Sequence, residues 1–332
     1  MKTVHKQADL AEKVKYKLIF NPKAGKKRSI LHFHKNPEAT LEQVQFLLEK
    51  YQIVVDLAPT KRAGHAKELA QEAIKQGYKA VLVAGGDGTV GEAANGLIGS
   101  DVPLGILPLG SFMNIARMLS VPNDLEKAVA LIKIGRTRKI DIGKITHMGE
   151  KLSEPYFFLE SSGFGWEAQV HESIRRMENG EFGEIFKIIK TFIDFYTYSV
   201  DVEIDDQKIH AKASAVTVSN GAFSGAALKL APEAKLNDHR LTVSVYKMTK
   251  YELLRFFVNL FYGKRGKTQK IKTYQGIKVV LKTKRPRMVH ADARVFGETP
   301  AQYEVVPNAL NVITGFPDPG EAYLNPRQIL DP

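Results

Sequence analysis

The sequence predicts an α/β protein with a doubly wound parallel sheet in its first half and an antiparallel β-rich domain in its second half. Over residues 1–140, short apolar runs alternate with helix-like spacing of apolar residues, which is typical of parallel strands joined by crossover helices. Beyond residue 140, short β-branched or aromatic runs separated by turn residues indicate antiparallel strands. We therefore predict domains over residues 1–140 and 141–320, and a tail, 321–332, that is able to return to the first domain.

The individual elements follow this change of pattern. In the first domain the predicted strands are 17–20, 53–57, 80–84 and 103–107. The predicted helices around them are 39–51, 64–77, 90–97, 111–119 and 125–134. In the second domain the predicted strands are 156–159, 199–204, 211–218, 241–246, 277–281 and 303–306. Helices are expected over 167–177, 183–198 and 251–262.

Bulk composition excludes several functional classes. The chain has no cysteine, so disulfides, thiolate metal sites and cysteine nucleophiles are excluded. No apolar run approaches the ~20 residues that cross a bilayer. The N-terminal stretch is polar and charged, unlike a secretory signal. We therefore expect a cytoplasmic protein.

The charge distribution indicates an anionic partner. The formal net charge is +12, and no acidic residue lies between Glu252 and Asp292, where lysine and arginine are frequent. No helix-turn-helix, RRM-like or zinc-finger pattern accompanies this run, so we expect no nucleic acid. The aromatic stretch 251–262 precedes the basic run, and aromatics beside cations suit an anionic membrane surface. A helix packed on its own domain explains the stretch equally well.

Three glycine-bearing turns predict a phosphate site. Gly85-Gly-Asp-Gly-Thr89 follows the third predicted strand, Asn21-Pro-Lys-Ala-Gly25 follows the first, and Pro108-Leu-Gly-Ser111 follows the fourth. Ligands bind at the carboxyl ends of parallel strands, glycine lets a phosphate approach the backbone, and amides at a helix start bind anions. Within the first of these turns, Asp87 is placed to act through Mg²⁺ and Thr89 to donate a hydrogen bond. The competing interpretation is that Gly-Asp-Gly is only a tight turn.

These turns resemble a known family. NPKAG, GGDGTVGEAANGL and PLGSFMNIARML are similar to the nucleotide-binding motifs of the diacylglycerol kinase catalytic domain, a family that includes bacterial soluble lipid kinases and sphingosine kinases. The similarity continues at 138–143, 160–165, 218–221, 231–234 and 299–310. The resemblance implies an NAD kinase/diacylglycerol kinase-like fold, and phosphorylation of a lipid hydroxyl, by default that of diacylglycerol, by ATP with Mg²⁺. Bacterial members are often dimers, so a homodimer is one expectation.

The resemblance also assigns site residues. It implies that ATP contacts Asn21, Pro22, Lys23, Ala24, Gly25, Thr60, Gly85, Gly86, Asp87, Gly88, Thr89, Glu92, Ser111 and Asn114. It further implies that Asp87 and Asp141 support the metal–phosphate network, which makes Asp87 both a catalytic and a metal residue.

The sequence departs from the family at the expected general base. The family's Asp-Gly-Glu falls on Asp292-Ala-Arg294, and arginine cannot accept a proton at neutral pH. We therefore favour Asp292 as the catalytic base, with Glu298 as the alternative. Asn114 stands where the family has an aspartate, and the Asp238–Thr242 turn retains one carboxylate where two are usual, so we expect its structural metal site to be weak or absent.

Two other functions remain compatible with the sequence. One is a lipid- or nucleotide-binding protein of the same fold whose catalysis is impaired, which the changes at Arg294, Asn114 and Thr242 motivate. The other is an NAD kinase-like kinase, because that fold also uses Gly-Gly-Asp-Gly-Thr at the same sheet edge. The identity of the lipid cannot be read from the sequence.

Overall fold

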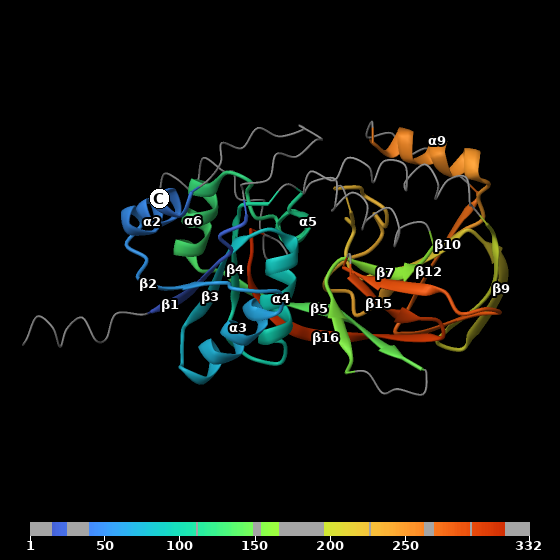
Figure 1. The fold of residues 1–332 in the computed structure, drawn as a ribbon, viewed down its shortest axis with the longest axis horizontal. Helices are drawn as coiled ribbons and strands as arrows, with labels where there is room; N and C mark the ends of the chain where they lie inside the picture. The colour runs from blue at the N-terminus through green and yellow to red at the C-terminus, as the bar shows by residue number, and fades with distance from the viewer. Residues whose placement is uncertain are drawn as a thin grey trace, which may run out of the picture. The chain divides into compact units, whose positions relative to one another are not determined.

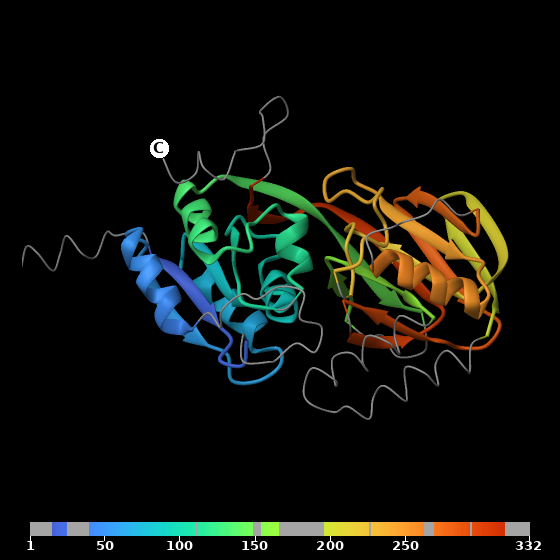
Figure 2. The same cartoon turned by 90° about the horizontal axis from the view of Figure 1, so that it is seen from above.

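The computed structural model describes residues 15–24, 40–110, 112–148, 154–165, 196–225, 227–261, 269–292 and 294–315. These residues form two compact units, which Figures 1 and 2 show from two directions. The first unit holds the described residues up to Lys139 and those from Leu310 onward, and the second unit is Ile140–Ala309. The predicted second domain extended to residue 320, whereas Leu310 already belongs to the first unit.

The first unit is a parallel sheet covered by helices. Its strands lie in the order β2 (Val55–Pro59), β1 (Tyr16–Phe20), β3 (Ala80–Gly85) and β4 (Leu104–Pro108). The described helices are α2 (Leu41–Lys50), α3 (His65–Lys75), α4 (Asp87–Leu97), α5 (Asn114–Met118) and α6 (Leu125–Ile134). Helix α3 packs against α4, and α2 packs against α6 (Figure 1). The predicted doubly wound α/β fold is confirmed.

Two helix starts differ from the prediction, and both lie at the predicted phosphate site. Helix α4 begins before the predicted range 90–97, because the carbonyl of Gly86 already accepts the amides of Thr89 and Val90, at 2.9 and 3.1 Å. Helix α5 begins later than predicted, because Met113 has a left-handed backbone (φ 49°) that no helix continues through.

The second unit consists of two sheets. One has the order β12 (Ile271–Gly276), β11 (Leu241–Tyr246), β10 (Ala215–Ser219), β7 (Ser161–Phe164), β14 (Met288–Ala291) and β15 (Arg294–Glu298). The other contains β16 (Ala301–Ile313), β13 (Lys278–Thr283), β8 (Tyr198–Ile204) and β9 (Gln207–Ala213), with β5 (Thr137–His147) and β6 (Tyr156–Phe158) beside β16. All neighbouring strands of the first of these sheets are antiparallel, so the predicted β-rich domain is confirmed as an architecture.

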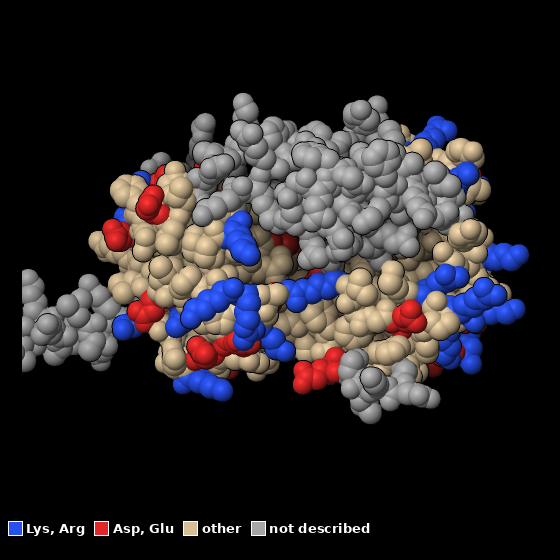
Figure 3. All heavy atoms as spheres, in the orientation of Figure 1, with Lys and Arg blue, Asp and Glu red and all other residues tan. Residues whose placement is uncertain are grey.

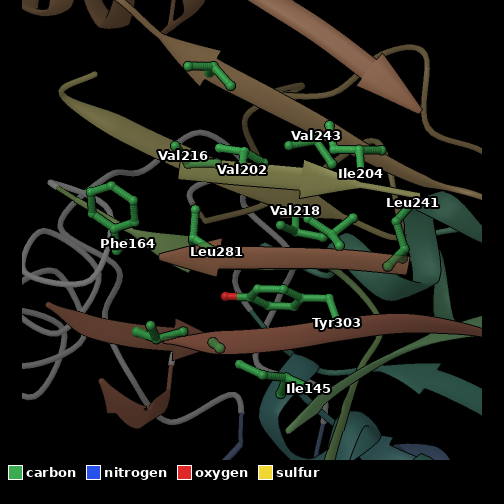
Figure 4. Close-up of a cluster of buried hydrophobic side chains, with 14 of the residues drawn as sticks. Ile145, Phe164, Val202, Ile204, Val216, Val218, Leu241, Val243, Leu281 and Tyr303 are labelled. Carbon is green, nitrogen blue, oxygen red and sulfur yellow. The ribbon is translucent and has the colours of Figure 1, made fainter. Parts of the chain in front are cut away.

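The core of the second unit lies between these two sheets. Val216, Val218 and Val243 from one sheet meet Leu281 and Tyr303 from the other (Figure 4). Edge-on aromatic contacts, such as that between the rings of Phe158 and Tyr303, help to fill this core. A smaller apolar cluster, which includes Tyr246, Leu253 and Phe256, packs helix α9 (Lys250–Phe261) on the same unit.

One predicted strand of the second unit was wrong. The range 211–218 contains two strands in different sheets, because β9 ends at Ala213 and β10 begins at Ala215. Between them, both the amide and the hydroxyl of Ser214 donate to the carbonyl of Tyr246. The predicted helix 251–262 is confirmed as α9. The predicted helix 167–177 lies outside the described residues, as does the predicted helix 183–198 up to residue 195, and strand β8 begins at Tyr198.

Candidate active site

The carboxyl ends of the strands in the first unit are held in line by hydrogen bonds. Thr60, Asn21 and Leu109 are each the first residue beyond a strand. Their amides donate to carbonyls of the neighbouring strands at 2.8, 3.0 and 3.2 Å. The turn after each strand therefore starts at the same sheet edge, as predicted for a ligand site of this fold.

Asn21 shapes the first glycine-bearing turn and joins it to the second. Its side-chain oxygen accepts the amide of Lys23 at 3.0 Å, and its carbonyl accepts the amide of Ala24 at 2.9 Å. Its side-chain nitrogen donates to the hydroxyl of Thr89 at 2.9 Å. The side chain of Lys23 is exposed at this edge, and Gly25 lies outside the described residues.

The second and third turns touch through their glycines. A Cβ atom on Gly110 would lie 2.6 Å from the Cα atom of Gly86, closer than real Cβ contacts. A Cβ atom on Gly85 would lie 2.9 Å from that of Thr89. Close packing therefore requires glycine at position 110 against the second turn and at position 85 within that turn, without any ligand. Ser111, in the third turn, lies outside the described residues.

The carboxylate of Asp87 binds the backbone at the start of helix α5. Its two oxygens accept the amides of Ile115 at 2.9 Å and Asn114 at 3.0 Å. Asp87 is half-buried, and burial raises the pKa of its carboxyl group, although the amide hydrogen bonds act in the opposite direction. Asp87 therefore fixes the third turn against the second, a contact that the sequence prediction did not contain.

The start of helix α4 presents backbone donors at the same edge. The amides of Asp87 and Gly88 stand in the first turn of the helix, where no intrahelical acceptor exists, so they suit an anionic ligand. Thr60 and Glu92 are half-buried, and Asn114 is buried with its amide bound to Asp87. The predicted ATP-contacting residues that the structure describes thus all belong to the first unit.

Asp292 has its own fixed position in the second unit. Its backbone is left-handed (φ 44°), and its carboxylate oxygens accept the amides of Leu159 at 2.7 Å and Glu160 at 2.9 Å. Glu298, the alternative base, is at the far end of the β14–β15 hairpin, opposite Met288. The structure therefore separates the two candidates along one hairpin.

Asp141 is buried and satisfied by the protein. Its carboxylate accepts the amide of His239 at 2.7 Å, the Nδ1 atom of the same histidine at 2.9 Å and the amide of Asn308 at 2.9 Å. The predicted metal role of Asp141 gains no support from these contacts. Among the described residues, no group of three or more His, Asp and Glu side chains could hold a metal ion.

Two family models match the chain in succession. The diacylglycerol kinase catalytic domain matches residues 15–145, and the YegS C-terminal NAD kinase beta sandwich-like domain matches residues 161–314. The two matched ranges correspond to the two units described above. The chain belongs to the diacylglycerol kinase family of lipid kinases.

Full-length relatives of this lipid kinase carry the same family name. The diacylglycerol kinase of Staphylococcus haemolyticus (strain JCSC1435) is 27% identical over 310 residues, which is 90% of this chain and 87% of the relative. That of Staphylococcus carnosus (strain TM300) is 25% identical over 309 residues, 90% of this chain and 94% of the relative. A crystal structure of a diacylglycerol kinase from Bacillus anthracis str. Sterne superposes with a TM-score of 0.69 at 22% identity. It covers 91% of this chain and 97% of the other, and so supports the fold.

The sequence prediction missed two residues that organise the second unit of this lipid kinase. The side-chain nitrogen of Asn220 donates to the carbonyls of Asp141 at 3.0 Å and Leu159 at 3.3 Å. The carbonyl of Glu160, which is 7% exposed, accepts the amide of Asn220 at 3.0 Å. These bonds join the Asp141 and Asp292 sites into one network. Both residues lie in segments that resemble the family, 160–165 and 218–221, and that resemblance was the only signal available.

Proposed function

We propose that this lipid kinase transfers the γ-phosphoryl group of ATP, bound with Mg²⁺, to a hydroxyl group of its lipid substrate. One observation carries the proposal. The three glycine-bearing turns meet at one sheet edge, linked by Asn21 to Thr89 and by Asp87 to helix α5, beside the free first-turn amides of helix α4. Such an edge supports the binding of nucleotide phosphates, and phosphoryl transfer depends mainly on their positioning.

Asp292 is the proposed general base for the lipid hydroxyl. Its oxygens accept the amides of Leu159 and Glu160, and an ionised carboxylate is a proton acceptor. The two amides hold the side chain in one orientation, which is what a general base requires. Arg294 is exposed at the start of β15 and is not proposed to take part in proton transfer.

Mg²⁺ is proposed to arrive with the phosphates of ATP. Mg²⁺ in kinases is commonly held by substrate phosphates and by one or two carboxylates, without a cage made only of protein ligands. On helix α4, Asp87 and Glu92 are the carboxylates nearest in sequence to the proposed phosphate site.

The enzyme is further proposed to act in the cytoplasm and to dock on an anionic membrane through helix α9. Leu253 and Phe256 bury one face of this helix, whereas Tyr251 is 74% and Leu254 is 48% exposed. Lysine and arginine side chains gather at the end of the second unit that carries α9 and β9 in Figure 1 (Figure 3). No helix in the described part of the chain is long and apolar enough to span a membrane.

The alternative is a member of the family that binds ATP and lipid but transfers phosphate slowly. The arginine at position 294 and the asparagine at position 114, both departures from the family pattern, favour it. The deciding experiment incubates the purified protein with γ-labelled ATP, Mg²⁺ and mixed lipid acceptors in micelles. Labelled lipid would establish the kinase, whereas ATP binding without labelled product from any acceptor would favour the impaired protein.

A further inference from the structure

The face of the six-stranded sheet that points away from the core carries buried hydroxyl groups. Side chains alternate along a strand, and Val216, Val218, Val243 and Val245 belong to the core between the sheets (Figure 4). The intervening residues therefore point to the opposite face. They are Thr217, Ser219, Thr242 and Ser244, which we call the hydroxyl face, and each is at most 1% exposed.

The members of the hydroxyl face are neighbours across strands. Thr217 pairs with Ser244 and Ser219 pairs with Thr242 in the β10–β11 register. Side chains opposite each other on antiparallel strands lie ~5 Å apart, within reach of a single ligand. The hydroxyl face ends at β11. On the next strand, β12, Thr273 pairs with Ser244 but is exposed.

Three of these hydroxyl groups have no hydrogen-bond partner in the part of the chain that the structure describes. They are the buried side-chain oxygens of Thr217, Thr242 and Ser244. Elsewhere on the same sheet the buried hydroxyl of Ser161 is satisfied, since it lies 2.8 Å from that of Ser224. A buried hydroxyl without a partner is costly, and such groups in native proteins call for an explanation such as a ligand or ordered water.

The hydroxyl face leads toward the proposed base. Ser219 pairs with Ser161 on β7, and the carbonyl of Ser161 accepts the amide of Asp292 at 3.0 Å. With strands ~4.8 Å apart, the three intervals from β14 to β11 span ~14 Å. On the neighbouring row, Thr217 pairs with Gly163, which in turn pairs with His290 on β14, and His290 is also buried. Polar surface thus continues from Asp292 across the sheet.

We propose that the hydroxyl face binds the headgroup of the lipid acceptor, and that this headgroup carries several hydroxyl groups, as in a glycolipid. The proposal rests on the proposed function. A headgroup of more than one sugar ring would be needed to give the three unpaired hydroxyls their partners while one of its own hydroxyls reaches Asp292, because the span is ~14 Å. An acyl chain cannot supply those partners. A site built to hydrogen-bond hydroxyl groups discriminates strongly against substrates that lack them. Diacylglycerol, with a single hydroxyl, is then a poor acceptor.

The test compares two acceptors with identical acyl chains, diacylglycerol and diglucosyl diacylglycerol, in detergent micelles. The expected kcat/KM is higher for the glucolipid by tenfold or more, on the order expected for a few hydrogen bonds. Thr217→Val and Ser244→Ala should each lower kcat/KM for the glucolipid by about three- to tenfold, the effect of one hydrogen bond, and leave diacylglycerol turnover unchanged. Thr273→Val, at the exposed neighbour, should change neither value.

A melting experiment separates the ligand from ordered water. Without lipid, Thr217→Val should melt at the wild-type temperature or higher, because the change removes an unpaired hydroxyl at nearly constant shape. A lower melting temperature would show that water or protein already satisfies the group and would overturn the proposal. Equal kcat/KM for both lipids in the wild type would overturn it as well.

The same measurements distinguish this proposal from the proposed function. If the wild-type protein phosphorylates neither lipid, the kinase proposal fails, and the rise in melting temperature caused by the glucolipid then decides the binding site. Loss of that rise in Thr217→Val, with the rise kept in Thr273→Val, would support the hydroxyl face. An equal rise in both variants would refute it.

Discussion

Asp87 shows how a residue predicted for metal chemistry also has a structural task. Its carboxylate offers two acceptors to the amides of Asn114 and Ile115, and alanine offers none. We expect Asp87→Ala to lower kcat by about a hundredfold or more, because the third turn loses its attachment and small misplacements at an active site have effects of that size. Steady-state kinetics with labelled ATP measures this change.

A matched control distinguishes the effect of losing the Asp87 contact on kcat from the effect of a general loss of stability. Asp124 caps helix α6 through the amide of Lys127 at 2.9 Å and takes no part in the proposed site. Asp124→Ala should cost about 1 kcal/mol of unfolding free energy with unchanged kcat. Wild-type kcat in Asp87→Ala would remove Asp87 from the mechanism.

Asp292 and Glu298 lie at opposite ends of one hairpin, so we expect substitutions at the two residues to have different effects on kcat. Asp292→Asn keeps the size of the side chain but loses the proton acceptor, so kcat should fall by about 10²- to 10⁴-fold with little change in ATP affinity. Glu298→Gln should leave kcat unchanged. Turnover and ATP binding measured in parallel test this pair, and the reverse pattern would make Glu298 the base.

The sequence predicted those elements well whose pattern is local. Strands β3 and β4 are buried along their whole length and appear as apolar runs, and helix α6 has Asp124 at its start and Gly135 at its end. The division between β9 and β10 was missed because no glycine or proline marks Ser214. The Asp87–α5 contact could not be predicted, since it joins residues distant in sequence and depends on the left-handed backbone of Met113.

Glu252, in the first turn of helix α9, is predicted to make the stability of the protein depend on pH. Glu252 accepts the amide of Thr249 at 2.9 Å, and it forms an ion pair with Lys270. The Lys270 hydrogen bond, followed by those of Thr249, lowers the pKa of Glu252 from 4.5 to about 2. A lowered carboxyl pKa stabilises the fold above the unfolded-state value, and this stabilisation disappears as the pH falls from 4.5 to about 2.

Glu252→Gln should therefore lower the melting temperature at pH 7, and the difference from wild type should shrink between pH 4.5 and about 2. Thermal unfolding across that range measures it. Glu154→Gln, at an exposed carboxylate, serves as the control and should show no such trend. If the difference in melting temperature between wild type and Glu252→Gln stays constant with pH, the charge of Glu252 does not contribute to stability through the ion pair or the cap.

Strand β16 is one continuous element that belongs to both units. Its first residues pair with β13 in the second unit, and Val312 pairs in parallel with Leu104 of β4 in the first. The amide of Asn308, on the same strand, binds Asp141. The residues from Leu310 onward therefore return to the first unit through an unbroken strand.

Membrane docking can be tested on the complete protein. If Tyr251 and Leu254 contact lipid beside basic side chains, binding to vesicles of anionic phospholipid should exceed binding to neutral ones and weaken as salt rises from 0.1 to 1 M, where the Debye length falls from ~10 to ~3 Å. Replacing both residues with serine should weaken sedimentation with anionic vesicles severalfold, because apolar contact area is lost.

The control for this experiment is Phe46, an aromatic side chain that is 65% exposed on helix α2 of the first unit. Phe46→Ser removes an exposed aromatic side chain from the first unit and should leave vesicle binding unchanged. Equal losses in both variants would show that exposed apolar surface acts without regard to place. Vesicle binding that does not change with salt concentration would contradict docking on an anionic membrane. The proposed phosphoryl transfer at the glycine-bearing turns is tested separately, by the labelled-ATP assay.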